Sequence, residues 1–382
     1  MANHGVFVTQ NDTSVSTPNV ATSGIPFVVG SAPLSEAESP ATAGIPVLAT
    51  SWAEAVEQLG YSDDWSTYTL CEFMYSHFKL YGCQPVVFLP VGETADASSV
   101  AAGFEAVELC LTMFGFVPDL LCAPGFSSDS TVAATMAAKA ASINGMFRAK
   151  ALVDIDADSY TAAVTAKNGG SYDESEIVCW PLCKNGDYTF HMSTIVAGTI
   201  AVADTDNGGV PYESPSNKTA QIDSLVDSSG SVIYMTLAQA NTVSAAGIVT
   251  ALNFMSSWVI WGNYTGCYPS DTDVKNYFIP VSRMFSWVSN SLITSFWSKL
   301  DKPMNRRLID SVLDSATIWL NGLVGQGYLL GARVEMLDSE NSLTNLMAGI
   351  IKLHVYMTPP SPAQEIDFVL EYDSDYVTSA LS

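Results

Sequence analysis

Gly125-Phe-Ser127 is the first stretch of the sequence that could carry chemistry. It follows an expected strand and precedes an expected helix, which is the setting of the nucleophilic serine in the G-x-S-x-G elbow of hydrolases. Asp129 stands where that motif requires its second glycine. We therefore interpret the stretch as an ordinary turn followed by a helix cap.

Three aspartates, Asp154, Asp156 and Asp158, have the spacing that opens a calcium-binding loop. In such a loop the sixth residue is a glycine, which permits a sharp turn, and the twelfth is a glutamate that binds the ion through both oxygens. Ser159 and Thr165 occupy those positions here. The sequence therefore argues against a metal site.

Two further patterns involve cysteines and glycines. Cys179 and Cys183 would share one face of a strand near His191, but a C-x3-C spacing with one histidine is a poor zinc signal, and we expect core thiols. Gly325-Gln-Gly327 follows a helix rather than a strand, which is the wrong setting for dinucleotide binding. We predict no catalysis, no cofactor and no metal, so the chain is expected not to be an enzyme.

The composition indicates an acidic, globular chain. Hydrophobic residues make up 48% of the 382 residues, which is enough for about two domains of roughly 150 residues with full cores. The formal net charge is −24. Because phosphate contacts need clustered Lys and Arg, we expect no nucleic-acid binding.

The few Lys and Arg side chains gather late in the chain. None precedes Lys79, and eight of the fifteen lie in the C-terminal third. These charges form either an ordinary solvated face or a contact surface for an acidic partner, and the residues alone leave both interpretations open. The eight are Lys275, Arg283, Lys299, Lys302, Arg306, Arg307, Arg333 and Lys352.

The seven cysteines are odd in number and mostly embedded in apolar runs. This pattern favours reduced core thiols and synthesis in a cytoplasm. The N-terminus has neither a basic start nor an apolar core, and no run reaches about 18 apolar residues. We therefore expect neither secretion by a signal peptide nor a membrane span.

The elements that could form a contact surface are clearest near the C-terminus. Pro303 suits the first turn of a helix over 303–323, in which apolar residues recur at three- and four-residue steps. Two glycines end this helix, and strands follow over 328–335 and 350–357. Because two strands alone are marginal in water, this half-exposed hairpin needs packing from behind or more strands beside it.

A lone strand is expected at each end of the chain. Thr358-Pro-Pro-Ser-Pro362 breaks the sheet, and residues 365–372 form a strand beyond this stiff link. Residues 4–9 form another strand ahead of a polar tract, and twenty extended residues reach on the order of 60 Å. Together with an open hairpin, these are the parts needed for strand exchange between subunits.

The remainder of the chain alternates strands and helices, which predicts an α/β fold, α+β overall, with a mainly parallel sheet. We expect strands over 85–90, 119–123, 149–155, 232–235 and 248–252. We expect helices over 102–114, 130–144, 192–202 and 281–296. The 192–202 helix lies within a turn-rich stretch, and the 281–296 helix should pack beside the 303–323 helix. Four parts follow: an N-terminal strand arm over 1–24, an outer α/β domain over 25–265, a helix and hairpin domain over 266–362 and a C-terminal strand arm over 363–382.

Six stretches, in their order and spacing, resemble the contractile tail sheath family. This family forms the outer cylinder of contractile phage tails, R-type bacteriocins and related injection systems. The stretches lie at both ends of the chain and through its C-terminal third. They are HGVFVTQ (4–10), GIPFVVGSAP (24–33), TLAQAN (236–241), WGNYT (261–265), NRRLIDSVLDSATIWLNGLVGQGYLLGARVE (305–335) and HVYMTPPSPAQEIDFVLEYD (354–373).

The resemblance implies roles for particular residues. Exchanged strands would be formed by Val6, Phe7, Val8 and Thr9 of the N-terminal arm and by Ile366, Phe368, Val369, Leu370 and Tyr372 of the C-terminal arm. The acceptor hairpin would use Leu329, Arg333, Val334, Leu353, Val355 and Tyr356. The domain over 266–362 would face an inner tube through Arg306, Arg307, Arg333, Asn341, Thr344 and Asn345. Since residues 341–348 are uncharged, the neighbouring arginines would have to supply the charge.

The resemblance also implies partners and a mechanism. Copies of the chain would stack as rings of six into a helical homo-oligomer around an inner tail tube, with baseplate and terminator proteins at the ends. The chain would be made in a bacterial cytoplasm, and assembled into a virion tail or a released particle. Contraction from a metastable extended state would drive the tube into a target envelope. A non-contractile shell or surface-layer subunit, which would share strand exchange, is the alternative.

Overall fold

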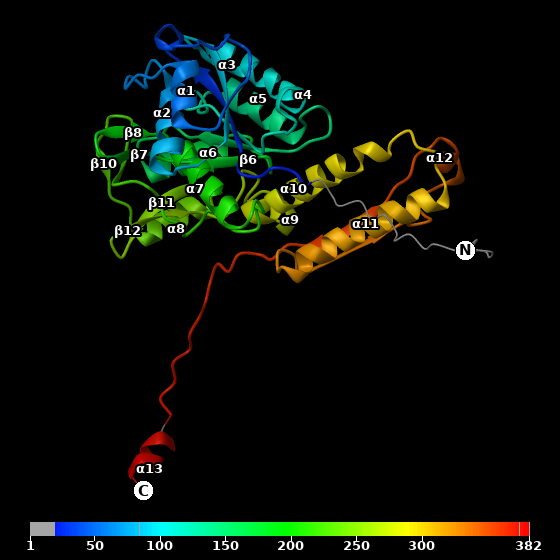
Figure 1. Cartoon of the computed structure of the whole chain (residues 1–382). Helices are drawn as coiled ribbons and strands as arrows, with labels where there is room; N and C mark the ends of the chain where they lie inside the picture. The colour runs from blue at the N-terminus through cyan, green and yellow to red at the C-terminus, as the bar shows by residue number, and fades with distance from the viewer. Residues whose placement is uncertain (1–19, 84, 374, 382) are drawn as a thin grey trace, which may run out of the picture.

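The computed structural model describes residues 20–83, 85–373 and 375–381. It consists of an α/β body, an elongated part made of two long helices and a hairpin, and a C-terminal segment that runs away from both (Figure 1). The expected strand at residues 4–9 lies outside the described residues. The four-part division of the chain stays a prediction, because helix α10 (Ile279–Phe296) contacts both the body and the elongated part.

The body is built on one eight-stranded sheet with the order β12-β11-β6-β5-β4-β1-β3-β2. The central strands pair in parallel, and only the two edge strands, β12 and β2, are antiparallel to their neighbours. The predicted mainly parallel sheet is therefore confirmed. Its strands are β1 (Pro26–Ser31), β2 (Val47–Ala49), β3 (Val86–Gly92), β4 (Leu120–Cys122), β5 (Lys150–Asp154), β6 (Glu176–Cys179), β11 (Ile248–Phe254) and β12 (Ser257–Trp261).

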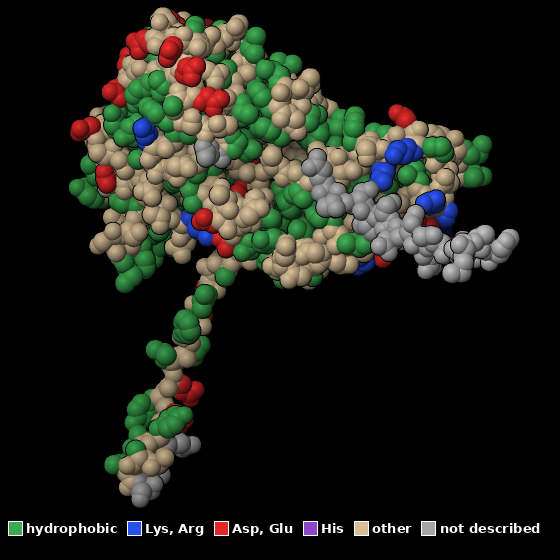
Figure 2. Space-filling view, in the orientation of Figure 1, with side chains coloured by type: hydrophobic (Ala, Val, Ile, Leu, Met, Phe, Trp, Pro, Cys, Tyr) green, Lys and Arg blue, Asp and Glu red, His purple; other side chains and the backbone are tan. Residues whose placement is uncertain are grey.

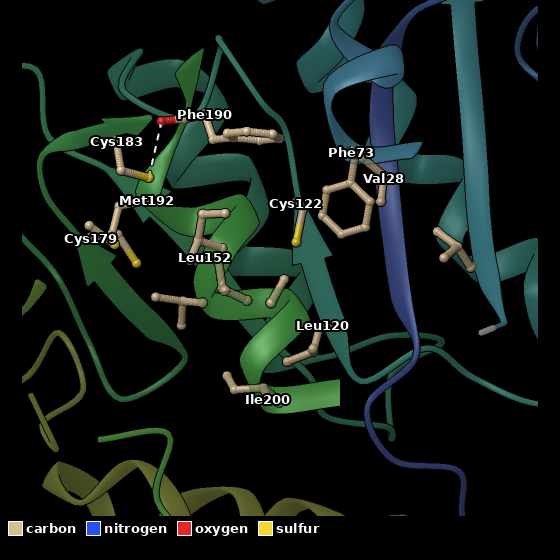
Figure 3. Packing of buried hydrophobic residues seen from close by; sticks show 14 of the residues in the cluster. Val28, Phe73, Leu120, Cys122, Leu152, Cys179, Cys183, Phe190, Met192 and Ile200 are labelled. Carbon is tan, nitrogen blue, oxygen red and sulfur yellow. Dashed lines mark hydrogen bonds between the residues drawn. The ribbon is translucent and has the colours of Figure 1, made fainter. Parts of the chain in front are cut away.

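The central strands are short apolar runs because both of their faces are buried. Successive residues alternate between two hydrophobic layers, so that Leu152 faces one layer and Val153 the other. In the first layer the side chains of Leu152 and Met192 lie close together (Figure 3). The helices of this layer are α1 (Trp52–Leu59), α2 (Thr69–Met74) with the π-helical η2 (Tyr75–Leu80), and α7 (Met192–Asp206).

The second layer covers the opposite face of the sheet. Its helices are α3 (Ala97–Gly103), η3 (Phe104–Leu109), α4 (Cys110–Phe114), α5 (Ser130–Ala141), α6 (Tyr160–Gly169) and α8 (Leu237–Ala245). The continuous stretch Ala97–Phe114 is long and apolar enough to cross a membrane by length and composition alone. Its buried residues, which include Phe104 and Val107, pack on the sheet, and Glu105 and Glu108 on its outer side pair with Lys139. It has the pattern of a helix that covers a sheet.

The stretch over 160–230 holds more regular structure than its turn-rich sequence predicted. Helix α6 opens it, capped by the Ser159 hydroxyl, which accepts from the Ala162 N–H. A small sheet follows, with the order β10-β9-β7-β8. Its strands are β7 (Leu182–Asn185), β8 (Tyr188–Phe190), β9 (Ser224–Val226) and β10 (Val232–Ile233).

The elongated part is held together by its own apolar cluster. The rings of Trp287 on α10 and Trp319 on α11 lie 5.8 Å apart, which confirms that these two helices pack side by side. The prediction that Pro303 occupies the first helical turn is wrong, since Asn305 caps α11 by accepting from the Leu308 N–H. The elements here are α9 (Val274–Tyr277), α10, η4 (Trp297–Lys299), α11 (Arg306–Gly325), β13 (Gly331–Glu335), α12 (Leu343–Met347) and β14 (His354–Thr358).

The C-terminal segment leaves the elongated part after β14 and extends away from it (Figure 1). Residues 365–372 are exposed and belong to none of the sheets formed by the described residues. A short helix that the sequence did not predict, α13 (Asp375–Leu381), follows them.

Candidate assembly surface

Strands β13 and β14 form an antiparallel pair in which Arg333 lies opposite Tyr356 and Val334 opposite Val355. The predicted hairpin is confirmed, and each of its strands begins three or four residues later than predicted. Within the described residues this sheet has two strands only, so both of its outer edges are open to main-chain pairing.

The inner face of the hairpin completes the apolar cluster of the elongated part. Val334 and Val355 pack with Leu320 and Leu323 of α11, and Leu329 in the turn before β13 is buried. This packing stabilises two strands that would be marginal alone. Of the predicted acceptor residues, Leu329, Val334 and Val355 therefore lie on the inner side.

The outer face of the hairpin carries a row of charged and aromatic side chains. The guanidinium carbon of Arg333 lies 3.8 Å from the centre of the Tyr356 ring, and its Nε is 3.0 Å from a Glu335 oxygen. On the other side, the His354 ring stacks on Tyr356 at 4.3 Å, and His354 Nδ1 lies 3.0 Å from Glu340. Such exposed pairs contribute little to the stability of the fold. Their contacts with one another fix the positions of these side chains on the outer face of the hairpin.

Asn341 closes the loop between the two strands. Its amide nitrogen donates to the carbonyls of Leu337 and Lys352, and its oxygen accepts from the Lys352 N–H. The side chain is buried, so it holds the loop from within instead of presenting itself to a partner. The family resemblance predicts Asn341 among the tube-facing residues, but its side chain is turned into the loop.

Helix α12 forms the tip of this loop, where Thr344 and Asn345 lie as predicted tube-facing residues. The Ser342 hydroxyl caps the helix by accepting from the Asn345 N–H. Thr344 is exposed, and so are two apolar side chains, Leu343 and Met347. The tip therefore offers apolar as well as polar contacts to a partner. The sequence alone did not show that Leu343 and Met347 are exposed.

Arg306 and Arg307 occupy the first turn of α11 and are exposed. Arg306 Nε lies 2.9 Å from Asp310 one turn later. Positive charges in the first turn oppose the helix dipole, so helix stability does not explain their position. A contact outside the chain would explain it.

Charge is divided unevenly along the chain. Residues 266–358 contain eight Lys and Arg and eight Asp and Glu, whereas residues 363–382 contain five carboxylates and no Lys or Arg. The visible face shows blue side chains gathered on the elongated part and red ones on the body and the C-terminal segment (Figure 2). The elongated part is therefore balanced in charge, whereas the C-terminal arm is acidic.

The C-terminal arm presents a set of large apolar side chains to solvent. Ile366, Phe368, Val369, Leu370 and Tyr372 are each at least 73% exposed. The arm is anchored at its root, where the Tyr264 hydroxyl donates to Gln364 Oε1 at 2.8 Å. Five exposed apolar side chains within the seven residues 366–372 are unusual, and exposed apolar surface of this kind marks an interaction site.

A buried ion cluster attaches α10 to the body. The Arg283 guanidinium binds both oxygens of Asp204 at 2.9 and 2.6 Å and an Asp119 oxygen at 2.7 Å. Beside it, Lys150 Nζ donates to the Ser282 hydroxyl at 2.7 Å, and burial lowers the pKa of Lys150 to about 8. Arg283 is one of the late positive charges of the sequence, and its position inside an apolar helix face is the signal of a buried partner.

The stretches that could carry chemistry have structural roles. The buried Ser127 donates its hydroxyl proton to the half-buried Asp154 at 2.7 Å, and Ser193 donates its N–H to the same carboxylate. Asp158 instead accepts from Ser228. Within the described residues no three His, Cys, Asp or Glu side chains are grouped so that they could hold a metal ion.

The prediction that Cys179 and Cys183 share one strand is wrong. Cys179 ends β6 of the main sheet and Cys183 lies in β7 of the small sheet, because the chain turns between them. Both thiols are buried, and Cys183 Sγ lies 3.5 Å from the carbonyl oxygen of Phe190 (Figure 3). Burial raises the pKa of both thiols, as expected for core cysteines.

His191 forms an ion pair that sequence analysis did not find. Its Nδ1 lies 2.8 Å from the buried Glu72 carboxylate, and Glu72 also accepts the His191 N–H. Burial disfavours the charged ring, but the Glu72 carboxylate more than offsets this and raises the pKa of His191 to about 9. The pair joins α2 to the start of α7.

Comparison with known proteins places this geometry in context. No family model matches the chain. Its sequence is 26% identical over 402 residues to a protein named as a prophage major tail sheath protein of Pseudomonas aeruginosa, covering 99% of this chain and 98% of that protein. It is 23% identical over 296 residues to the tail sheath protein of Burkholderia phage BcepMu, a match that covers 74% of this chain but 61% of the phage protein.

The fold of the chain is similar to that of solved structures from contractile injection systems. The sheath complex of the extracellular contractile injection system PVC in its contracted state aligns with a TM-score of 0.73, over 98% of this chain and 99% of that one at 16% identity. The anti-feeding prophage (AFP) baseplate aligns with a TM-score of 0.72, over 98% and 99% at 20% identity. The expected resemblance to contractile tail sheath proteins is thereby confirmed.

Proposed function

We propose that this chain, which is related over its whole length to tail sheath proteins of contractile particles, is the structural subunit of a contractile tail sheath. It polymerises helically around an inner tail tube. It contracts from a metastable extended state to a shorter, wider one and so drives the tube into a target envelope.

One observation carries this proposal: within the described residues the hairpin has no further strands beside it, and the exposed apolar arm belongs to no sheet. The arm follows Pro359, Pro360 and Pro362, so it cannot fold straight back onto β14 as a tight hairpin. If the arm of one copy pairs with the hairpin of another copy, the hairpin gains a further strand and the arm becomes part of a sheet.

The energetics favour exchanged strands as permanent links. Each main-chain hydrogen bond contributes only about 1 kcal/mol net. Burying a large apolar side chain contributes about 1.5–3 kcal/mol, and the arm has five to bury. The links therefore survive a rearrangement that exchanges weaker surface contacts.

The N-terminal arm supplies the second strand, through Val6, Phe7, Val8 and Thr9. Its point of departure supports this role, because Ala21 is fixed to α10. The Ala21 N–H donates to the Ser291 hydroxyl at 2.9 Å, and Trp287 Nε1 donates to the Ala21 carbonyl at 3.0 Å. Both arms thus leave from the elongated part.

The tube-facing surface combines Arg306, Arg307 and Arg333 with Thr344 and Asn345 at the loop tip. The exposed apolar tip of α12 adds contacts, and Asn341 holds the loop that carries them. An inner tail tube with acidic side chains at these contacts would pair with the three arginines.

The assembly is a stack of rings, six copies to a ring, that ends at a baseplate and a terminator. The chain is made in a bacterial cytoplasm and released as part of a virion or extracellular particle. It acts without catalysis, cofactor, nucleic acid or insertion into a membrane. A non-contractile shell is not favoured, since the matched structures include a sheath in its contracted state.

Negative-stain electron microscopy of the purified chain, alone and with its tube protein across salt concentrations, tests the proposal. Hollow striated cylinders should form, and deletion of residues 1–10 should leave a folded monomer that forms none. Cylinders that persist after the deletion would contradict exchange of the N-terminal strand. A wild-type chain that stays monomeric even with tube protein would contradict the sheath function.

A further inference from the structure

The longest uncharged run of the sequence folds into one corner of the body. No Asp, Glu, Lys, Arg or His occurs over residues 228–270, whereas residues 25–227 contain twenty-five Asp and Glu and seven Lys and Arg. The run forms β10, α8, β11 and β12, of which α8, β11 and β12 lie together in Figure 1. A neutral surface therefore interrupts a body that is otherwise acidic.

Four exposed apolar side chains gather at this corner. Helix α8 packs against β11 and is joined to it by two residues, so the two run in opposite directions and the first turn of α8 lies toward the far end of β11. Phe254 faces the same side of the sheet as Ile248, which belongs to the layer that contains α8. Tyr234 and Met255 are 88% and 87% exposed, Phe254 is 55% exposed and Leu237 is 46% exposed. We call these four side chains the neutral corner.

The turn that carries Met255 is strained by the residues in it. Met255 and Ser256 connect β11 to β12 as a two-residue turn, with φ angles of 52° and 65°. Positive φ at both positions suits Asn-Gly, because a bulkier side chain costs free energy there. Contacts within the chain do not offset that cost, since Met255 is almost fully exposed. A contact outside the chain would explain why a methionine stands at this position.

The charge of this corner indicates what kind of partner covers it. A basic partner would be attracted by carboxylates, and the run over 228–270 supplies none. A second copy of this chain is itself acidic, so it approaches without repulsion where the surface is neutral. Interface cores are depleted of charged residues and enriched in Tyr, Phe and Met. The neutral corner therefore fits another copy of the chain.

The neutral corner is also continuous with the root of the C-terminal arm. A groove of about 760 Å³ is lined by Asn241 on α8 and Trp261 on β12, and by Gln364 and Ile366 at the start of the arm. Trp261 Nε1 donates to Asn241 Oδ1 at 2.9 Å, which joins β12 to α8. Since the arm is proposed above to lead to a neighbouring copy, that copy is brought to this side of the body.

We propose that the neutral corner is a contact between the body of one copy and a neighbouring copy in the assembled sheath. This rests on the sheath function proposed above and adds to it a surface that the exchanged arms do not use. The arms keep the copies linked, and the neutral corner determines where a body touches its neighbour. Because this contact is apolar, salt weakens it less than it weakens a contact between exposed charges.

Methionine oxidation tests the contact without changing the sequence. Hydrogen peroxide converts an exposed methionine to its sulfoxide, and mass spectrometry of peptides measures the rate. Met255 in tube-free cylinders should oxidise roughly tenfold more slowly than in the wild-type chain below its assembly concentration. The control is Met347, which is 80% exposed at the tip of α12 and should stay reactive when no tube is present.

Two variants test the same contact by changing it. M255N/S256G supplies the pair that the turn favours, so the unassembled chain should melt at a higher temperature while the concentration needed for assembly rises. F254E/M255E adds two carboxylates and should raise that concentration roughly tenfold at low salt. Its matched control, M113E/M146E, adds the same charges at two exposed methionines elsewhere on the body and should change it by less than about twofold.

Met255 that oxidises equally fast in cylinders and in the unassembled chain would overturn the contact. Cylinders of M255N/S256G or F254E/M255E that form at the wild-type concentration would overturn it as well. In either case wild-type cylinders still uphold the sheath function. A wild-type chain that forms no cylinders with or without tube protein would overturn both proposals.

Discussion

At the scale of single residues, groups that could do chemistry are used to hold the fold. Ser127 and Asp154 bind each other, and Asp129 caps α5 by accepting from the N–H groups of Thr131 and Val132. The sequence predicted that neither stretch forms the site that its motif would build, because each motif lacked at least one required residue. It could not predict the partner of His191, since Glu72 lies 119 residues away and no local pattern links the two.

His191 gives the fold a pH dependence at neutral to alkaline pH. Its pKa is about 9 in the folded chain and about 6.5 when unfolded, so the folded state holds the extra proton between these values. This stabilisation is fully present below pH 6.5, and falls by up to about 1.4 kcal/mol per pH unit until the pH passes 9. The measurement is urea unfolding of the wild type and H191Q, which keeps a donor for Glu72 but cannot be charged.

The free-energy difference between wild type and H191Q should shrink steadily from pH 6.5 to pH 9. Taking the difference removes other titrating groups, including Lys150, whose lowered pKa acts in the opposite direction over the alkaline range. A difference that is the same at pH 6 and pH 9 would contradict a charged His191 in the folded state.

At the scale of elements, strong periodicity made the sequence informative. The parallel strands and the 281–296 and 303–323 helices were predicted because apolar residues mark their buried faces. Helix α6 was missed because its sequence, Tyr160–Gly169, is rich in small and polar residues and is set by its Ser159 cap. Strands β8 and β9 were missed because three residues carry too little periodicity to show it.

The surface at the hairpin was predicted in outline only. Alternation along 328–335 and 350–357 predicted the hairpin, and the acceptor role of its residues stays a prediction. The inward turn of Asn341 could not be predicted, because it depends on the loop bringing Leu337 and Lys352 within reach of one amide. The C-terminal helix α13 follows a segment whose acidic and apolar pattern indicated only a strand.

Helix α10 should depend on Arg283 for its attachment to the body. The variant R283M removes the cation and leaves Asp119 and Asp204 largely buried without it, which should lower the free energy of unfolding by about 3–5 kcal/mol. The matched control R306M removes an exposed, singly paired arginine and should cost less than about 1 kcal/mol. Denaturant unfolding compares the two, and equal small effects would show that the buried cluster does not secure α10.

At the scale of the whole molecule, the division of charge separates two kinds of contact. The elongated part balances its charges and still presents exposed cations, while the body and the C-terminal arm are acidic. Copies that met through the acidic faces of their bodies would repel each other, which supports the proposal that copies join through the elongated part and the arms. This division of charge is consistent with a sheath in which the arms keep the subunits linked while the bodies change their positions relative to one another.

Attachment to the tube should depend on Arg306 and Arg307. The variant R306E/R307E should release the sheath from an acidic tube, with at least a tenfold loss of co-sedimentation at low salt, while tube-free polymers still form. Arg306 and Arg307 are exposed, so the fold should be unaffected. Unchanged co-sedimentation would remove both residues from the tube contact.

The central claim, that copies are joined by exchanged arms at the hairpin, is tested most directly by a disulfide between two different chains. A chain carrying V369C in the arm is mixed with one carrying either K352C, two residues before β14, or T358C at the end of β14, and the assembled fraction is oxidised. The seven native cysteines are buried, so the introduced pair reacts selectively.

Added strands bring facing Cα atoms to about 4.5–5.5 Å, which a disulfide spans. The account predicts a cross-linked dimer of the two chains, by mass spectrometry, with one of the two hairpin positions and only in the assembled fraction. Assembled cylinders that yield no cross-link between chains at either position would contradict it.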